Sequence, residues 1–178
     1  MTGEKRDYDP ACFSDAGGLA WGEAHGESIL GTIERRVADY YDVDDEDLPI
    51  GDQWMEENRV AYPKPHCVYV LRCNNPRKAD TLIDVWKFWF DEVADEIPSW
   101  AWAAYYSDQV YYVGYTADPY SRISAHVEAP NEGARFVKTF PPHEIEELHW
   151  FDFEDDARIY EEQRAEELSD SDTFVSQH

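Results

Sequence analysis

The stretch that decides the fold is Val110–Lys138, VYYVGYTADPYSRISAHVEAPNEGARFVK. Its first residues, Val110–Gly114, are aromatic or β-branched up to the glycine, which predicts a β-strand. Gly114 allows the chain to leave the strand at a point where a side chain would obstruct it. The stretch is therefore predicted to begin with a strand that ends at a glycine.

A short helix is predicted directly after this strand, from about Pro119 to Val127. Two residue types that cap helices, and a proline suited to the first helical position, come before or at its start: Thr116, Asp118 and Pro119. Arg122 and His126 are four residues apart, so both project from one helical face. A cation and an imidazole on one rigid helix suit a phosphate anion, and Tyr112 at the strand end is expected to converge on them.

These residues resemble the second half of the GIY-YIG nuclease domain. That family shows Tyr-Ile-Gly, then an arginine eight residues after the glycine and a histidine twelve after it; Tyr112-Val113-Gly114, Arg122 and His126 keep both spacings. Cys67–Cys73 resembles the first motif, with Tyr69 as its tyrosine and Cys67 in place of its glycine. Ala157–Glu161 resembles a later helix of the family, with Glu161 as its glutamate. The resemblance covers roughly Cys67–Leu168 and is closest to the small stand-alone members.

The resemblance implies an α/β (α+β) fold with a small three-stranded, mixed or antiparallel sheet flanked by helices. We expect an N-terminal extension with one or two helices at 1–62, the nuclease-like domain at 63–168 and a frayed C-terminal tail at 169–178. Ile145–Phe153 is expected to be the third strand, and Ala157–Leu168 the last helix. Gly133–Val137 resembles the loop that leads into that third strand.

The first hairpin contains a predicted helical insertion at 74–106, because Tyr69 and Tyr112 are 43 residues apart. Within it, Asp80–Ile97 carries a broad apolar face at helical spacing. Four tryptophans of the insertion can stack on nucleic-acid bases or pack in the core, and the core interpretation is favoured: Trp86, Trp89, Trp100 and Trp102. A protein partner is a further possible ligand of this aromatic segment.

The N-terminal extension contains one amphipathic pattern, at Glu27–Tyr41, typical of a helix. The segment Glu34–Leu48, ERRVADYYDVDDEDL, also suggests a helix-turn-helix pair. We favour a single helix packed on the domain, because the second helix of a DNA reader needs basic residues.

The activity implied by the resemblance is metal-dependent endonucleolytic hydrolysis of DNA. In that interpretation Glu161 binds one Mg²⁺ or Mn²⁺ ion, Arg122 holds the scissile phosphate, and Tyr69 is the candidate general base, with Tyr112 and His126 positioning groups or relaying protons. Four further residues are expected to contact the substrate: Gly114, Thr116, Arg135 and Lys138. The alternative is a nucleic-acid or protein binding module that keeps the fold and does little chemistry.

The charge of the chain is strongly negative. Its 15 basic and 39 acidic residues give a net charge of −24, which ordinarily argues against nucleic-acid binding. Acid of this kind, with little lysine, is also typical of proteins from salt-loving organisms, where it serves solubility. The acid avoids the predicted phosphate site, since Tyr111–Phe140 has three acidic and three basic residues. Without an apolar run of membrane length or a signal peptide, we expect a cytoplasmic protein.

Overall fold

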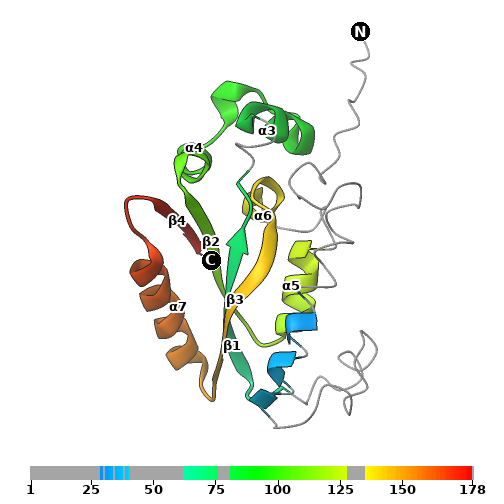
Figure 1. Ribbon diagram of the computed structural model, residues 1–178, viewed down its shortest axis with the longest axis vertical. Coiled ribbons are helices and arrows are strands. Elements are labelled where there is room, and N and C mark those ends of the chain that lie inside the picture. The colour runs from blue at the N-terminus through cyan, green and yellow to red at the C-terminus, as the bar shows by residue number, and fades with distance from the viewer. Residues whose placement is uncertain are drawn as a thin grey trace.

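The computed structural model describes residues 62–75, 81–127 and 135–177, together with residues 29, 31–33, 35–37 and 39–40 of an N-terminal helix. Predictions for 1–28, 41–61, 76–80 and 128–134 lie outside these described residues. The elements with printed labels in Figure 1 are β1 (His66–Cys73), α3 (Leu82–Phe90), α4 (Ser99–Tyr106), β2 (Gln109–Thr116), α5 (Pro119–Val127), α6 (Arg135–Thr139), β3 (Pro142–Phe151), α7 (Glu154–Leu168) and β4 (Thr173–Gln177).

The strands form one mixed sheet in the order β3-β1-β2-β4. Strand β1 is antiparallel to both β2 and β3, and β4 is parallel to β2. The predicted α/β fold with a small sheet between helices is confirmed: Figure 1 shows α7 on one side of the sheet, and α5 with the N-terminal helix on the other.

The prediction of three strands and a frayed tail at 169–178 is wrong in one respect, because Thr173–Gln177 forms the fourth strand. The polar residues Ser169–Asp172 directly precede this short strand, and their sequence is typical of a tail rather than of a strand. The backbone carbonyl of Asp172 accepts hydrogen bonds from the amides of Asp108 and Gln109, and these bonds bring the chain back beside β2.

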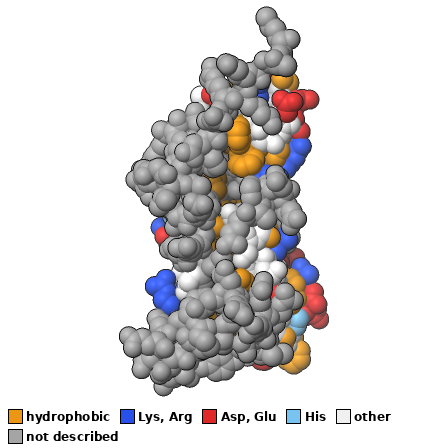
Figure 2. Space-filling view, turned by 90° about the vertical axis from the view of Figure 1, so that its right-hand side faces the viewer, with side chains coloured by type: hydrophobic (Ala, Val, Ile, Leu, Met, Phe, Trp, Pro, Cys, Tyr) orange, Lys and Arg blue, Asp and Glu red, His pale blue; other side chains and the backbone are white. Residues whose placement is uncertain are grey.

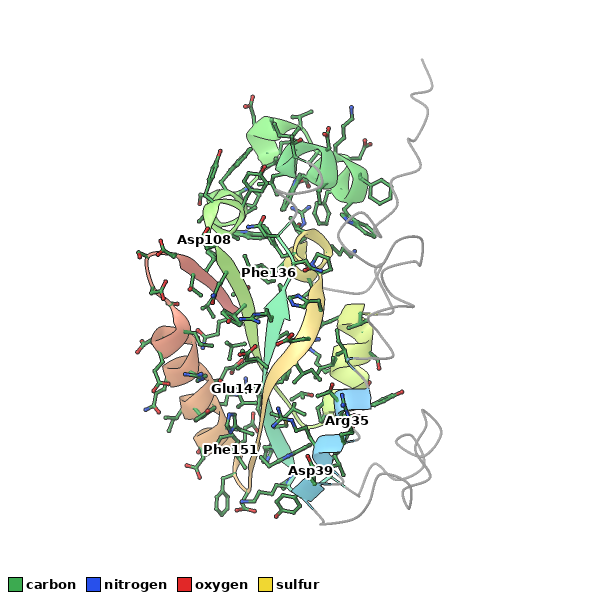
Figure 3. The ribbon with its side chains drawn as sticks, viewed as in Figure 1. Arg35, Asp39, Asp108, Phe136, Glu147 and Phe151 are labelled. Atoms are coloured by element: carbon green, nitrogen blue, oxygen red, sulfur yellow. The ribbon has the colours of Figure 1, made fainter. Side chains whose placement is uncertain are left out.

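Each face of the sheet has its own hydrophobic core, because successive side chains of β1 point to opposite faces. Cys67, Tyr69, Leu71 and Cys73 join the core under α5 and α6. Val68 and Val70 join a smaller core under α7, with Ala157 and Ala165. On β3, Glu147 and Phe151 lie on the α7 side of the sheet, as Figure 3 shows.

The insertion between β1 and β2 is helical, as predicted, and packs into the larger core. The helix predicted over Asp80–Ile97 is shorter, since Asp91 takes a left-handed conformation (φ 54°) after Phe90, and a 3₁₀ turn at Ala94–Glu96 follows. The core interpretation is confirmed for Trp86, which is fully buried and contacts the rings of Phe90 and Trp100.

The described residues of the N-terminal helix pack on the domain. Ile29, Ile33 and Val37 are buried and belong to the same core as Tyr69. The expectation of a helix that covers the domain is therefore met over these positions. Among the described helices, none is long and apolar enough to cross a membrane.

Strand β4 gives a first prediction. Phe174 stacks on Phe136 of α6, with ring centroids 6.1 Å apart. Phe174→Ala is expected to lower the free energy of unfolding by about 2 kcal/mol, because an aromatic ring leaves a packed position. Chemical denaturation measures this, with Phe153→Ala as control, since Phe153 is 69% exposed and its loss should change stability by less than about 0.5 kcal/mol. Equal, small effects of the two substitutions would mean that the C-terminal strand is frayed.

Candidate active site

The predicted site begins with a close approach between β1 and β2. Tyr69 lies directly opposite Gly114 in the antiparallel register. A Cβ atom at Gly114 would stand 2.5 Å from the hydroxyl oxygen of Tyr69 and 2.6 Å from its Cζ atom. The phenol therefore crosses β2 over the bare backbone of the glycine, and its ring stacks on that of Tyr112, with centroids 6.1 Å apart.

His126 closes this pair of phenols from α5. Its Nε2 atom is 3.1 Å from the hydroxyl oxygen of Tyr69, and its ring meets Tyr112 edge to face at 5.0 Å. All three side chains are buried: Tyr69 and Tyr112 completely, and His126 to 6% exposure. Tyr69, Tyr112 and His126 thus form one compact unit, as the sequence predicts.

Helix α5 is fixed at its first turn by the predicted capping residues and by one residue that the sequence does not reveal. The Asp118 amide donates to the Thr116 hydroxyl, and the Ser121 amide donates to the Asp118 carboxylate. The missed residue is Tyr62, which precedes β1. Its hydroxyl donates to Asp118 (2.8 Å) and accepts from the Tyr120 amide (3.1 Å). No local pattern signals a bond across 56 residues, so only the fold could reveal it.

Arg122 is the exposed member of the set. Its guanidinium interacts with the hydroxyls of Tyr69 and Tyr112, and no ion pair joins it to a carboxylate of a described residue. By contrast, Arg72, Arg135 and Arg164 are each held by glutamates. A guanidinium set among hydroxyls, rather than neutralised by a carboxylate, keeps its charge available for an anion.

Glu161 reaches the site from α7, on the other face of the sheet. The residues of α7 that face the sheet are Ala157, Glu161 and Ala165, four residues apart. The two alanines let the helix approach closely, and the carboxylate between them is 3% exposed. One carboxylate oxygen, Oε1, is buried without a hydrogen bond among the described residues. Oε2 is 3.9 Å from Nη1 of Arg158.

Burial governs the proton equilibria of the set. It raises the pKa of Tyr69 well above its usual value; the neighbouring Tyr112 adds to the rise and Arg122 opposes it. Burial also raises the pKa of Tyr112, against the influence of Arg122, with a further rise from the Glu161 carboxylate. Burial raises the pKa of Glu161, while Arg158 and the backbone amide of Tyr115 lower it. Four of the five predicted residues are therefore electrostatically connected across β2: Tyr69, Tyr112, Arg122 and Glu161.

Three of the four residues predicted to contact the substrate also have a structural role. Gly114 is covered by Tyr69, and Thr116 caps α5. Arg135 is not in the site: it pairs with Glu92 at 2.5 Å and lies over the ring of Phe90, so it holds the insertion against α6. Lys138 is half-buried on α6.

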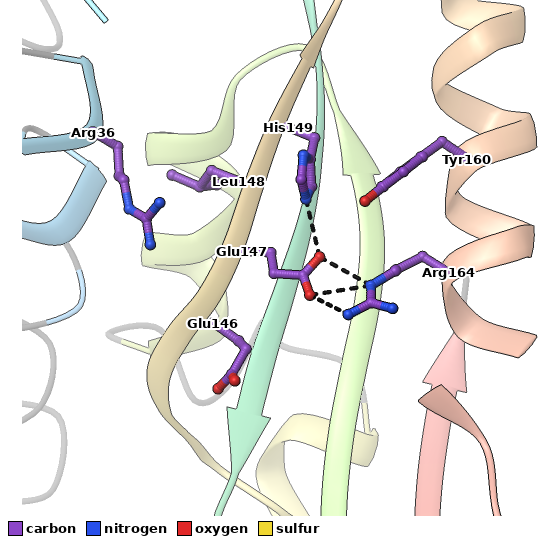
Figure 4. Close-up of a pocket in the computed structure, with 7 residues that line it drawn as sticks. All are labelled: Arg36, Glu146, Glu147, Leu148, His149, Tyr160 and Arg164. Carbon is purple, nitrogen blue, oxygen red and sulfur yellow. Dashed lines mark hydrogen bonds and ion pairs between the residues drawn. The ribbon is translucent and has the colours of Figure 1, made fainter. Parts of the chain in front are cut away.

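A cavity of about 340 Å³ lies away from this set, at the edge strand β3. Figure 4 shows Glu147 at its centre, bound by two nitrogens of Arg164 and by His149 at 3.0 Å. Its lining has two arginines and two glutamates, and it contains none of the predicted site residues. On the face seen in Figure 2, the described cations and carboxylates are likewise interspersed, without a single basic patch.

Comparison with known families agrees with the geometry. The family described as the GIY-YIG catalytic domain matches residues 100–170, which include β2, α5, β3 and α7. Residues 100–170 therefore match the GIY-YIG nuclease-type domain that the sequence resembles. The match does not extend to β1, so the place of Tyr69 rests on its pairing with Gly114. No curated protein and no solved structure matched the chain.

The contact between Tyr69 and Gly114 gives a second prediction. Gly114→Ala is expected to lower the free energy of unfolding by about 1–3 kcal/mol, because the added methyl group overlaps the phenol. Gly31→Ala is the matched control: it lies in the N-terminal helix with nothing within 4 Å of the added atom, and alanine there should stabilise by about 1 kcal/mol. Denaturant titration measures both. A Gly114→Ala protein as stable as the wild type would contradict the close approach.

Proposed function

We propose that this protein is a metal-dependent endonuclease that hydrolyses DNA phosphodiester bonds at the Tyr69–Arg122–Glu161 site. The observation that carries the proposal is the joint arrangement around β2 of two phenols, an imidazole, a buried carboxylate and a guanidinium that no carboxylate of a described residue pairs with. Any one of these side chains has an ordinary structural explanation. Together they supply what phosphodiester hydrolysis needs: anion binding, a proton acceptor and a hard oxygen ligand.

Arg122 holds the scissile phosphate in this mechanism. It stands at the exposed side of the phenol pair, and its planar guanidinium can donate two parallel hydrogen bonds to phosphate oxygens. Helix α5 is fixed by the Asp118 cap and by Tyr62, so the guanidinium is positioned before the substrate arrives. Pre-positioned donors of this kind stabilise charge that develops in the transition state.

Tyr69 and His126 act together as the proton acceptor. A phenol whose pKa is raised by burial is a poor base by itself. The Nε2 atom of His126 lies within hydrogen-bonding distance of the phenol, so the Tyr69 proton passes to Nε2 while the phenol oxygen takes a proton from the attacking water. In this relay no free tyrosinate forms. The activated water then attacks phosphorus, and the bond to the leaving oxygen breaks.

Glu161 would hold the divalent metal ion. Its buried Oε1 atom has no hydrogen-bond partner among the described residues, as is expected of an oxygen intended for another ligand. The described residues contain no group of three or more acidic, histidine or cysteine ligands. This fits Mg²⁺ or Mn²⁺, since such ions use one or two carboxylates and keep several waters. When bound, the ion supplies positive charge for the phosphoryl oxygens and the leaving group.

A binding module remains the alternative function, and one observation favours it. Tyr69 and Tyr112 are fully buried, whereas a phenol that exchanges a proton with substrate water must be reached by that water. A protein that binds DNA through Arg122 without cleaving it would retain the same packing. Direct assay of cleavage separates the two functions.

Plasmid nicking tests the proposal. The wild-type protein is expected to nick supercoiled DNA with Mg²⁺ or Mn²⁺ in concentrated KCl and to stop when chelator is added. Arg122→Ala should reduce the rate by at least about 100-fold, as loss of a transition-state donor does. Lys87→Ala, which removes an exposed cation from α3, should leave the rate unchanged. Absence of cleavage on plasmid, flap and junction DNA would favour the binding module.

The buried carboxylate gives a prediction that needs no activity. Because the pKa of Glu161 is raised in the folded protein, the wild type binds more protons folded than unfolded and loses stability as pH rises from the ordinary value of 4.5 through the raised one. Without metal, Glu161→Gln should therefore be more stable than the wild type at pH 7, with the difference vanishing at acidic pH. Mg²⁺ should raise the melting temperature of the wild type only.

Thermal unfolding across pH, with and without Mg²⁺, measures both effects. Glu162→Gln on the exposed face of α7 is the control, and it should follow the wild type in its response to metal. An equal metal-induced shift in Glu161→Gln would show that the ion binds elsewhere.

A further inference from the structure

A second group of polar side chains surrounds Tyr115, the residue after Gly114 on β2. Because successive side chains of a strand alternate, Tyr115 lies on the α7 face, where it packs on the smaller core. The Nδ1 atom of His66 is 2.8 Å from the Tyr115 hydroxyl oxygen, and the two rings stack at 5.8 Å. The guanidinium carbon of Arg158 lies 4.2 Å from the centroid of the Tyr115 ring. One phenol thus holds a histidine and an arginine in place.

This group is continuous with the proposed metal ligand. Nη1 of Arg158 is 3.9 Å from Oε2 of Glu161, and the backbone amide of Tyr115 interacts with the same carboxylate. Pairing between β2 and β4 ends, among the described residues, at Val113 and Gln177. Tyr115, whose backbone amide interacts with the Glu161 carboxylate, lies beyond that point on β2. The groups around Tyr115 and those around Tyr112 therefore meet at Glu161, one on each face of the strand.

The ordinary explanation for Arg158 is a surface ion pair with Glu154, one turn earlier on α7. Exposed pairs at this spacing contribute little to stability, and they do not need the ring contact that fixes this guanidinium over Tyr115. The side chain of Arg158 is 51% exposed, so part of it faces solvent next to the carboxylate. When Nδ1 of His66 accepts a hydrogen bond from the Tyr115 hydroxyl, the ring hydrogen is on Nε2. Nε2 is then a second hydrogen-bond donor, beside the Arg158 guanidinium.

We propose that Arg158 and His66, held on Tyr115, bind the backbone phosphate next to the scissile phosphate of a nucleic-acid strand. The inference rests on the proposed function, because the strand is located by Arg122 and Glu161. The strand crosses the edge of β2, with one phosphate on the α5 side and its neighbour on the α7 side. A chain of net charge −24 repels a nucleic acid at long range, and salt screens this repulsion, so binding depends on such close contacts.

The salt dependence of binding tests the contact. A fluorescein-labelled DNA duplex is titrated with protein in chelator, over the KCl range in which circular dichroism shows each variant folded. Loss of one phosphate contact lowers the slope of log Kd against log salt by about 1. We expect this reduction for Arg158→Gln, and recovery of the wild-type slope for Arg158→Lys. Lys87→Gln removes the same charge from α3, away from β2, and should keep the wild-type slope.

Plasmid nicking by the same proteins separates this inference from the proposed function. If the wild type cleaves DNA but Arg158→Gln keeps the wild-type slope, the phosphate contact is wrong and the nuclease stands. If Arg158→Lys behaves like Arg158→Gln, or Lys87→Gln lowers the slope equally, the contact is likewise refuted. If the wild type neither binds the duplex nor cleaves DNA, both proposals fall.

Discussion

The contact on which the proposed site depends is that between the phenol of Tyr69 and the bare backbone of Gly114. Antiparallel pairing sets these residues opposite each other, and any side chain at Gly114 would occupy the position of the phenol. Because the ring crosses β2 at this point, its hydroxyl meets His126 on α5 and its face meets Tyr112. Packing alone therefore requires a glycine at position 114, whatever the chemistry of the site.

Two different helices, α5 and α7, supply the two sides of the site. On one side, a capped helix presents Arg122 and His126, and Tyr62 ties the cap to the segment before β1. On the other side, α7 brings Glu161 to the sheet between two alanines. Burying a charged carboxylate lowers the stability of the folded protein. The raised pKa of Glu161 reflects the same desolvation. Its Oε1 atom has no hydrogen bond among the described residues, which supports the proposal that Glu161 serves ligand binding rather than the fold.

Much of this arrangement is predictable from local sequence. The bounds of α5, its capping residues and the shared face of Arg122 and His126 follow from spacing alone. The assignment of Tyr69 to the first motif strand follows from the family resemblance, although 43 residues separate the two motif tyrosines. Its register opposite Gly114 does not follow from the sequence. Strand β4 is not predictable in the same way, because its stability comes from tertiary pairing with β2 and from Phe174. Long-range bonds, such as those of Tyr62 with Asp118 and Arg135 with Glu92, leave no local signal either.

The central claim is that Tyr69 and His126 act as one proton-accepting unit. Single-turnover cleavage by Tyr69→Phe, His126→Gln and the double variant tests it most directly, since residues that act together are strongly non-additive. Tyr69→Phe keeps the ring over Gly114 and removes only the hydroxyl. The account predicts that each single substitution lowers the rate by a similar large factor, and that the double variant is no slower than the slower single variant. Full activity of Tyr69→Phe, or a double variant slowed by the product of the two factors, would contradict the account.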